Sequence, residues 1–270
     1  MRRVALALAI LLSSIAARGA EPAKPLEVLY VTGGCCHDYD AQKAMITRGM
    51  AARARIRCTV VHEGGTSTNH PISIYEKPDW SKGYDVVFHN ECFSDVKDPK
   101  FLEKILAEHK KGVPAVLMHC AMHCYRAGND EWFKFCGITS PGHGAHYAYT
   151  CKLVGKHPVL AGLPLEWEVP KEELYYSDKV WSTATPLGEA MSTDRNAMQT
   201  CIWTNQYDKT RVFGTTIGHY AETVATPEFL GLVTRGTLWA AGKLQDDGEP
   251  VPALRLTEAE KKAVLDPAPA

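Results

Sequence analysis

The sequence predicts an α/β protein built on a mostly parallel β-sheet with helices on both faces. Four short segments in the first half of the chain have the near-continuous hydrophobicity of strands that are buried on both sides. Helical spacing over residues 39–54 and 99–111 alternates with them, and this alternation is typical of parallel sheets. The predicted strands cover residues 26–32, 57–62, 84–89 and 114–119.

The second half of the chain is less regular but continues the same architecture. We expect a pair of strands in a hairpin around Asp194, Arg195 and Asn196, and a long helix over residues 226–242. Further predicted strands cover residues 147–154, 174–184 and 211–217. Because there is no internal repeat and no clear linker, we predict one domain over residues 26–243, followed by a polar tail over residues 244–270.

The first 20 residues have the features of an export signal. Arg2 and Arg3 precede an apolar run over residues 4–12, and small residues follow as far as Ala20. The run is too short to cross a bilayer, so we predict a signal peptide over residues 1–20 that is cleaved and leaves no stable membrane span. We therefore expect an exported protein, either periplasmic or secreted.

The charge balance argues against a nucleic-acid partner. The chain has 30 basic and 31 acidic residues. Loss of Arg2, Arg3 and Arg18 with the leader leaves 27 basic residues against the 31 acidic ones, a net charge of −4. Since no basic cluster remains that would follow a phosphate backbone, we expect a small-molecule ligand and no nucleic acid. We also expect no nucleotide cofactor.

Histidines concentrate where the predicted strands end. Ligand crevices of open α/β sheets lie outside the carboxyl ends of the strands, so these histidines are expected to share a site. They are His37, His89, His119, His123, His143, His146 and His219. We expect structural roles for His62, His70 and His109, in loops or on solvated faces.

The segment after the fourth predicted strand allows two kinds of chemistry. His119 and His123 have the spacing that places two imidazoles on one helix face, where they can chelate a metal ion. Cys120 lies where some α/β hydrolases have a nucleophile, but Met118 and Met122 stand at positions where a nucleophile turn needs glycine. A buried structural thiol is therefore favoured over a nucleophile at Cys120.

The nine cysteines give an odd count, and their pairing cannot be deduced from the sequence. Export favours disulfides. Several cysteines nevertheless lie inside apolar runs, where free cysteine behaves as a small hydrophobic residue. Cys35 and Cys36 are adjacent and cannot bridge without strain.

A series of short motifs resembles the ThuA-like (trehalose utilisation) family. The resemblance extends over roughly residues 26–243, and the order and number of the motifs make it specific. The motifs cover residues 28–34 with His37, 84–87, 112–119, 132–137, 142–144, 157–159, 162–164, 172–175, 211–219 and 239–242.

The resemblance implies a flavodoxin-like, class I glutamine-amidotransferase-like layered sheet. It also implies a link to oxidised (keto) disaccharides and related glycosides, and it does not imply amidotransfer. By position, the recurrent histidines of the family match His37, His119, His143 and His219, and its acidic position matches Glu173. This chain differs from the family pattern at Cys35-Cys36 and after His119, where small residues are usual.

Three functions follow as hypotheses. The first is an enzyme that hydrolyses or eliminates a glycoside or keto-sugar with a bound divalent metal, zinc being the first candidate. Its predicted metal ligands are His37, His119 and His219, and its predicted catalytic residues are Glu173 as a base and His143 or His123 as a proton carrier or fourth ligand. The second is a non-catalytic carbohydrate-binding or accessory protein. The third is a Cys-His amidotransferase-type hydrolase that uses Cys120. Formation of a homo-oligomer is left open.

Overall fold

The computed structural model describes residues 24–265. The predicted signal peptide over residues 1–20 lies outside the described residues, as does the end of the tail. Within the described part of the chain, none of the helices is long and apolar enough to cross a membrane.

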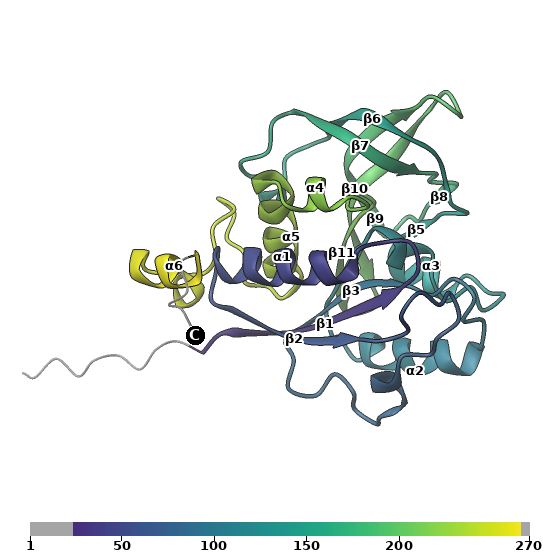
Figure 1. Ribbon diagram of the computed structural model, residues 1–270, viewed down its shortest axis with the longest axis horizontal. Helices are drawn as coiled ribbons and strands as arrows, with labels where there is room; N and C mark the ends of the chain where they lie inside the picture. The colour runs from purple at the N-terminus through teal and green to yellow at the C-terminus, as the bar shows by residue number, and fades with distance from the viewer. Residues whose placement is uncertain (1–23, 266–270) are drawn as a thin grey trace, which may run out of the picture.

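A nine-stranded sheet runs through the molecule (Figure 1). Its parallel half contains, in spatial order, β2 (Ile56–His62), β1 (Leu26–Gly34), β3 (Val86–Cys92), β4 (Ala115–Met118) and β11 (Thr210–Thr215). Its antiparallel half continues from β11 with β10 (Ala197–Tyr207), β9 (Ala184–Ser192), β6 (His143–Leu153) and β7 (Glu166–Tyr175). The sheet is therefore mixed, and the prediction of a mostly parallel sheet describes only the half built from β2, β1, β3, β4 and β11. Tight turns between β9, β10 and β11 account for the reversal of direction.

The predicted strand over residues 174–184 is wrong. Its residues are divided among the end of β7, the short strand β8 (Lys179–Val180), which pairs with β5 (Ile138–Thr139), and the start of β9. In β7 the buried Trp167 and Val169 alternate with exposed residues. Such alternation marks a strand with one solvated face, which a search for continuous apolar runs does not detect.

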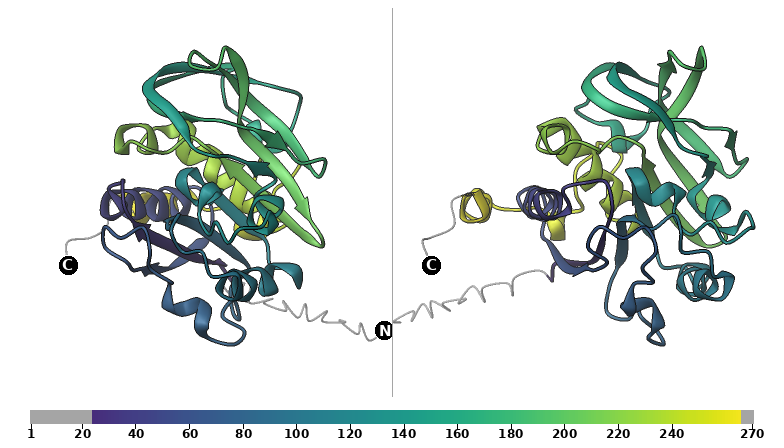
Figure 2. Two further views of the ribbon diagram at one scale, coloured as in Figure 1. Left: turned by 90° about the vertical axis from the view of Figure 1, so that its right-hand side faces the viewer. Right: turned by 45° about the vertical axis from the view of Figure 1, so that its right-hand side comes forward.

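Helices cover both faces of the parallel half, as predicted (Figure 2). The helices are α1 (Tyr39–Ala51), α2 (Pro99–Lys110), α3 (Glu131–Cys136), α4 (Ala221–Val224), α5 (Pro227–Ala240) and α6 (Glu258–Leu265), with 3₁₀ turns η1 (Ser73–Glu76), η2 (His119–His123), η3 (Pro158–Leu160) and η4 (Pro252–Leu254). Val28 and Tyr30 of β1 pack with α1 and α5, whereas Leu29 and Val31 pack with α2 and α3. Because successive side chains of a strand point to opposite faces, β1 contributes to both cores.

The segment that follows β1 approaches β3 closely. Gly34 has a φ of +100°, and a Cβ atom there would lie 2.4 Å from the carbonyl oxygen of Cys92. This position therefore needs glycine. Asp38 then caps α1 by accepting a hydrogen bond of 2.9 Å from the backbone N–H of Ala41. These two contacts hold residues 35–37 beside the end of β3.

Part of the tail packs on the parallel half of the sheet. The guanidinium of Arg55 lies 2.7 Å from the carboxylate of Glu260 in α6. The backbone N–H of Arg55 donates to the carbonyl oxygen of Leu254 over 2.8 Å, and Leu254 is buried. These contacts attach the described residues of the tail to the start of β2.

His89 and His109 lie elsewhere than expected. Strand β3 extends to Cys92, so His89 lies within the strand instead of after its end, and its side chain is fully buried. His109 is also fully buried and not solvated, with its Nδ1 donating to the carbonyl oxygen of Val113 over 2.8 Å. The two rings contact each other, with 3.2 Å between their Nε2 atoms. Both histidines therefore belong to the interior and not to the predicted site.

Burial gives His109 a role in acid stability. It lowers the pKa of His109 from 6.5 to about 3, so the ring takes up a proton more readily in the unfolded chain. The free energy of unfolding should therefore fall as the pH falls through 6.5 towards 3. We predict that, between pH 6.5 and 5, the free energy of unfolding falls by about 1–2 kcal/mol less in His109→Gln than in wild type. Urea unfolding at several pH values measures this, with His70→Gln as a control on the surface; equal pH dependence in both variants would contradict the prediction.

Candidate functional site

The carboxylate of Glu173, in β7, lies at the centre of a cluster of histidines. Its Oε2 lies 3.2 Å from His119 Nε2 and 3.3 Å from His219 Nδ1. Its Oε1 lies 2.9 Å from His146 Nε2 and 3.3 Å from His143 Nε2. The site is thus assembled across both halves of the sheet: His119 and His219 follow the parallel strands β4 and β11, while the other three residues lie in the antiparallel strands β6 and β7.

His37, after β1, completes the cluster. One ligand atom from each of His37, His119, His219 and Glu173 lies within 4.8 Å of the others. The His37 ring also contacts the rings of His119 and His219, with 4.7 Å between centroids in each case. The structure therefore brings together the three predicted metal ligands and the predicted base.

Backbone contacts orient the two histidines that follow the parallel strands. His119 has a φ of +52°, and its Nδ1 donates to the carbonyl oxygen of Thr216 over 2.5 Å. His219 is held from the other side, because its backbone N–H donates to the carboxylate of Glu172 over 2.8 Å. The first contact leaves the lone pair of the neutral His119 ring on Nε2, facing the carboxylate of Glu173.

Three buried nitrogens of this cluster lack a satisfactory hydrogen bond among the described residues. They are His37 Nε2, His119 Nε2 and His219 Nδ1. Buried polar atoms are usually hydrogen-bonded, so three such nitrogens beside one carboxylate could share a cation or a proton. The same atoms belong to the group that converges with Glu173. This donor set, imidazole nitrogens with a carboxylate oxygen, suits a divalent metal ion such as zinc.

The charges in the cluster oppose the predicted role of Glu173 as a base. Burial raises the pKa of Glu173, but the contacts with His119 and His219 outweigh it and hold that pKa far below its usual range. Burial alone would lower the pKa of His119, whereas the contact with Glu173 and the charge of Glu172 raise it. Burial and the neighbouring imidazoles lower the pKa of His37 to about 2. Near neutral pH, Glu173 is thus an anion and His37 a neutral imidazole.

His143 and His146 form the accessible side of the cluster. Their side chains are 30% and 34% exposed, against 7% for Glu173. His143 Nδ1 donates to the Gly144 carbonyl oxygen over 2.9 Å, and His146 Nδ1 lies 2.6 Å from the hydroxyl of Tyr220. In each ring the other nitrogen faces Glu173, so both rings connect the buried carboxylate to solvent.

His123 lies apart from the metal-ligand group. The segment from His119 is the 3₁₀ turn η2, in which residues four apart differ in direction by about 120°, so the two rings do not share a face. The His123 Nε2 lies 3.3 Å from the hydroxyl of Tyr175, which donates to Glu173 over 3.4 Å. Burial and the charge of Arg126 lower the pKa of His123 to about 3. Among the residues that the structure describes, His123 is thus linked to Glu173 through Tyr175.

Cys120 forms a disulfide with Cys92, and its side chain is buried. In this state its sulfur is not a nucleophile. The sequence placed His146 in the predicted site and Glu172 and Tyr175 in a family motif, but it assigned no role to any of the three. Their contacts with the cluster could not be predicted from position after a strand, because all three lie within the antiparallel strands β6 and β7.

Fold and site together define an α/β protein with a histidine–carboxylate cluster at the edge of a mixed sheet. The Trehalose utilisation family, ThuA, matches residues 27–240, and the chain belongs to this family.

Solved structures of related fold include two ThuA-like proteins. The one from Parabacteroides merdae has a TM-score of 0.66 and 20% identity, over 88% of this chain and 99% of that chain. The one from Bacteroides uniformis has a TM-score of 0.59 and 14% identity, over 87% and 98%. A structure titled Agd3, a novel carbohydrate deacetylase, has a TM-score of 0.50 and 10% identity, over 82% of this chain and 33% of that chain. At these identities the likeness concerns the fold. No curated protein matches the sequence.

The electrostatic coupling inside the cluster can be tested with Glu173→Gln. Loss of the anion removes the main contact that raises the pKa of His119, so this pKa should fall in the variant. Titration of the imidazole signals by NMR, in protein treated with a chelator, measures the change. Glu168→Gln, an exposed position on the same strand, is the control and should leave the His119 signal unchanged. An unchanged pKa in Glu173→Gln would contradict the assignment.

Proposed function

We propose that this protein binds a divalent metal ion through His37, His119, His219 and Glu173, and uses the site on a glycoside or keto-sugar. The observation that carries the proposal is the convergence of three buried imidazole nitrogens, none with a well-aligned hydrogen bond among the described residues, on one carboxylate. Zinc is the first candidate, because imidazole and carboxylate donors in a four-membered set are typical of zinc sites.

Within this proposal the residues have distinct roles. The metal, when bound, polarises a carbonyl or hydroxyl oxygen of the substrate. Glu173 orients the histidines through its contacts with their rings. It does not act as a base, because its pKa lies far below its usual range. His143, which is partly exposed and faces Glu173, carries the proton between solvent and substrate. His146, whose ring contacts the hydroxyl of Tyr220, lies opposite Glu173 in the paired strand β6 and holds the Glu173 carboxylate in place.

The carbohydrate substrate is proposed from the family and not from the geometry. The family is described by trehalose utilisation, and one structure of similar fold is titled a carbohydrate deacetylase. Fold alone does not establish a reaction. We also propose a flavodoxin-like, class I glutamine-amidotransferase-like arrangement for the parallel half of the sheet, and export directed by residues 1–20.

A second candidate is a carbohydrate-binding protein without catalysis. All four proposed ligands come from the protein, and a fully protein-bound set is typical of structural zinc sites. A catalytic site would need one of the four positions to be open to substrate.

Metal binding is tested first. We expect the purified protein, after dialysis with zinc, to retain one ion per chain, and His119→Ala to weaken its binding by at least about 100-fold, because a direct ligand is lost. Elemental analysis and calorimetric titration measure this. The control is His157→Ala, a histidine on the loop before η3, outside the cluster. Equal affinity in wild type and His119→Ala would remove the proposed site.

Catalysis is tested separately from metal binding. Incubation with glycosides and keto-glycosides, followed by mass spectrometry, should reveal a product. His143→Asn should lower turnover by about 100-fold and leave the metal content unchanged, because a proton carrier is lost while the proposed ligands remain. Binding of sugar without any product in wild type would favour the non-catalytic candidate.

A further inference from the structure

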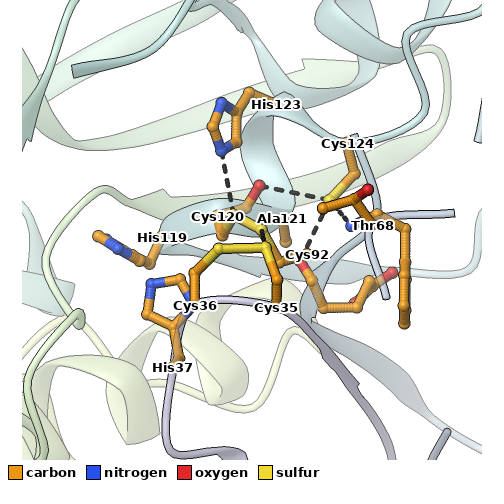
Figure 3. Close-up of a disulfide and its surroundings, with 12 residues drawn as sticks. Cys35, Cys36, His37, Thr68, Cys92, His119, Cys120, Ala121, His123 and Cys124 are labelled. Carbon is orange, nitrogen blue, oxygen red and sulfur yellow. Dashed lines mark hydrogen bonds between the residues drawn. A yellow bond between two sulfur atoms is a disulfide. The ribbon is translucent and has the colours of Figure 1, made fainter. Parts of the chain in front are cut away.

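Four cysteines form two disulfides that contact each other beside the histidine cluster. Cys35 bridges to Cys36 in the segment after β1, and Cys92 at the end of β3 bridges to Cys120 in η2. The Sγ atoms of Cys35 and Cys92 are 3.8 Å apart. Figure 3 shows the two bridges side by side, with His119 and His37 to their left and His123 above Cys120. We name Cys35–Cys36 the outer disulfide and Cys92–Cys120 the inner disulfide.

The two bridges differ in their access to solvent. Cys36 is exposed and Cys35 is partly buried. Cys92 and Cys120 are only 4% and 5% exposed. A thiol from outside can therefore reach Cys36 but has little access to the inner disulfide. The backbone at Cys36 has a φ of +83°, an unfavourable conformation for a residue other than glycine.

His123 lies beside the inner disulfide and can donate a hydrogen bond to Cys120 Sγ when that sulfur leaves as a thiolate. His123 Nε2 lies 3.0 Å from Cys120 Sγ. The guanidinium of Arg126, which can only donate, lies 2.8 Å from His123 Nδ1. The neutral ring therefore carries its proton on Nε2, facing Cys120. A thiolate that forms at Cys120 would receive this hydrogen bond.

We propose that the outer disulfide relays electrons between an external dithiol and the inner disulfide, through attack of Cys35 on Cys92. In the first step a thiolate of the external dithiol attacks Cys36 Sγ, the Cys35–Cys36 bond breaks, and Cys35 leaves as a thiolate. In the second step Cys35 attacks Cys92 Sγ, the Cys92–Cys120 bond breaks, and Cys120 leaves as a thiolate beside His123 and then takes a proton from solvent.

Two further exchanges complete the relay. The second thiol of the external dithiol attacks the first sulfur of the same molecule, which is bonded to Cys36. The bond to Cys36 breaks, and the oxidised dithiol and a Cys36 thiolate are released. Cys36 then attacks Cys35 Sγ, which restores the outer disulfide and releases Cys92. The net reaction oxidises one external dithiol to its disulfide and reduces Cys92–Cys120 to two thiols. The same steps in reverse would oxidise the inner pair.

The intermediate can be trapped with a matched pair of full-length variants. Both Cys36→Ser and Cys35→Ser abolish the outer disulfide, but only Cys36→Ser keeps the thiol that lies 3.8 Å from Cys92. We expect peptide mapping without reduction, after iodoacetamide treatment, to find a Cys35–Cys92 bridge and an alkylated Cys120 in Cys36→Ser. In Cys35→Ser we expect an intact Cys92–Cys120 bridge. An intact inner disulfide in both variants, or a Cys36–Cys92 bridge in Cys35→Ser, would overturn the relay.

The rate of reduction provides an independent test. With dithiothreitol as the external dithiol, the inner disulfide should be reduced roughly tenfold more slowly when Cys35 and Cys36 are both replaced by serine, because the relay sulfurs are lost. Cys58→Ser, a free cysteine in β2, is the control and should match wild type. Equal rates in wild type and the double variant would overturn the proposal, as would mapping that finds no Cys92–Cys120 bridge in wild type.

Discussion

The arrangement of the site depends on one constraint, the burial of the Glu173 carboxylate. A buried anion is costly unless it is compensated by positive or hydrogen-bonding partners. Here four imidazoles from three regions of the chain surround it. The antiparallel strands β6 and β7 must fold over the carboxyl ends of the parallel strands to bring it there. The mixed character of the sheet is therefore a condition for the site.

Neighbouring residues of β7 hold the loop of His219 in two ways. Glu172 accepts hydrogen bonds from the backbone N–H groups of His219 and Tyr220, while Glu173 contacts the His219 ring. Backbone and side chain of one histidine are thus fixed by consecutive carboxylates. This arrangement defines the direction of the ring, which is what a metal ligand requires from the residues around it.

The disulfides and the proposed metal ligands occupy the same short segments. His37 follows the outer disulfide directly, and His119 precedes Cys120 of the inner disulfide. Because the chain is continuous, these bridges restrict the positions of two of the three histidine ligands. Reduction of either disulfide would therefore change the constraint on the backbone of residues 35–37 or 119–120, and with it the positions of His37 or His119.

Local sequence patterns determined the parallel half of the fold and part of the site. Continuous apolar runs and helical spacing are short-range properties, so they identified β1 to β4, α1, α2 and α5. Position after a strand was enough to place His37, His119 and His219 at one edge. Only the tertiary structure decided that His89 lies inside β3, that His123 points away, and that His146 joins Glu173. These depend on strand length, on turn geometry and on pairing between distant strands, which no local pattern encodes.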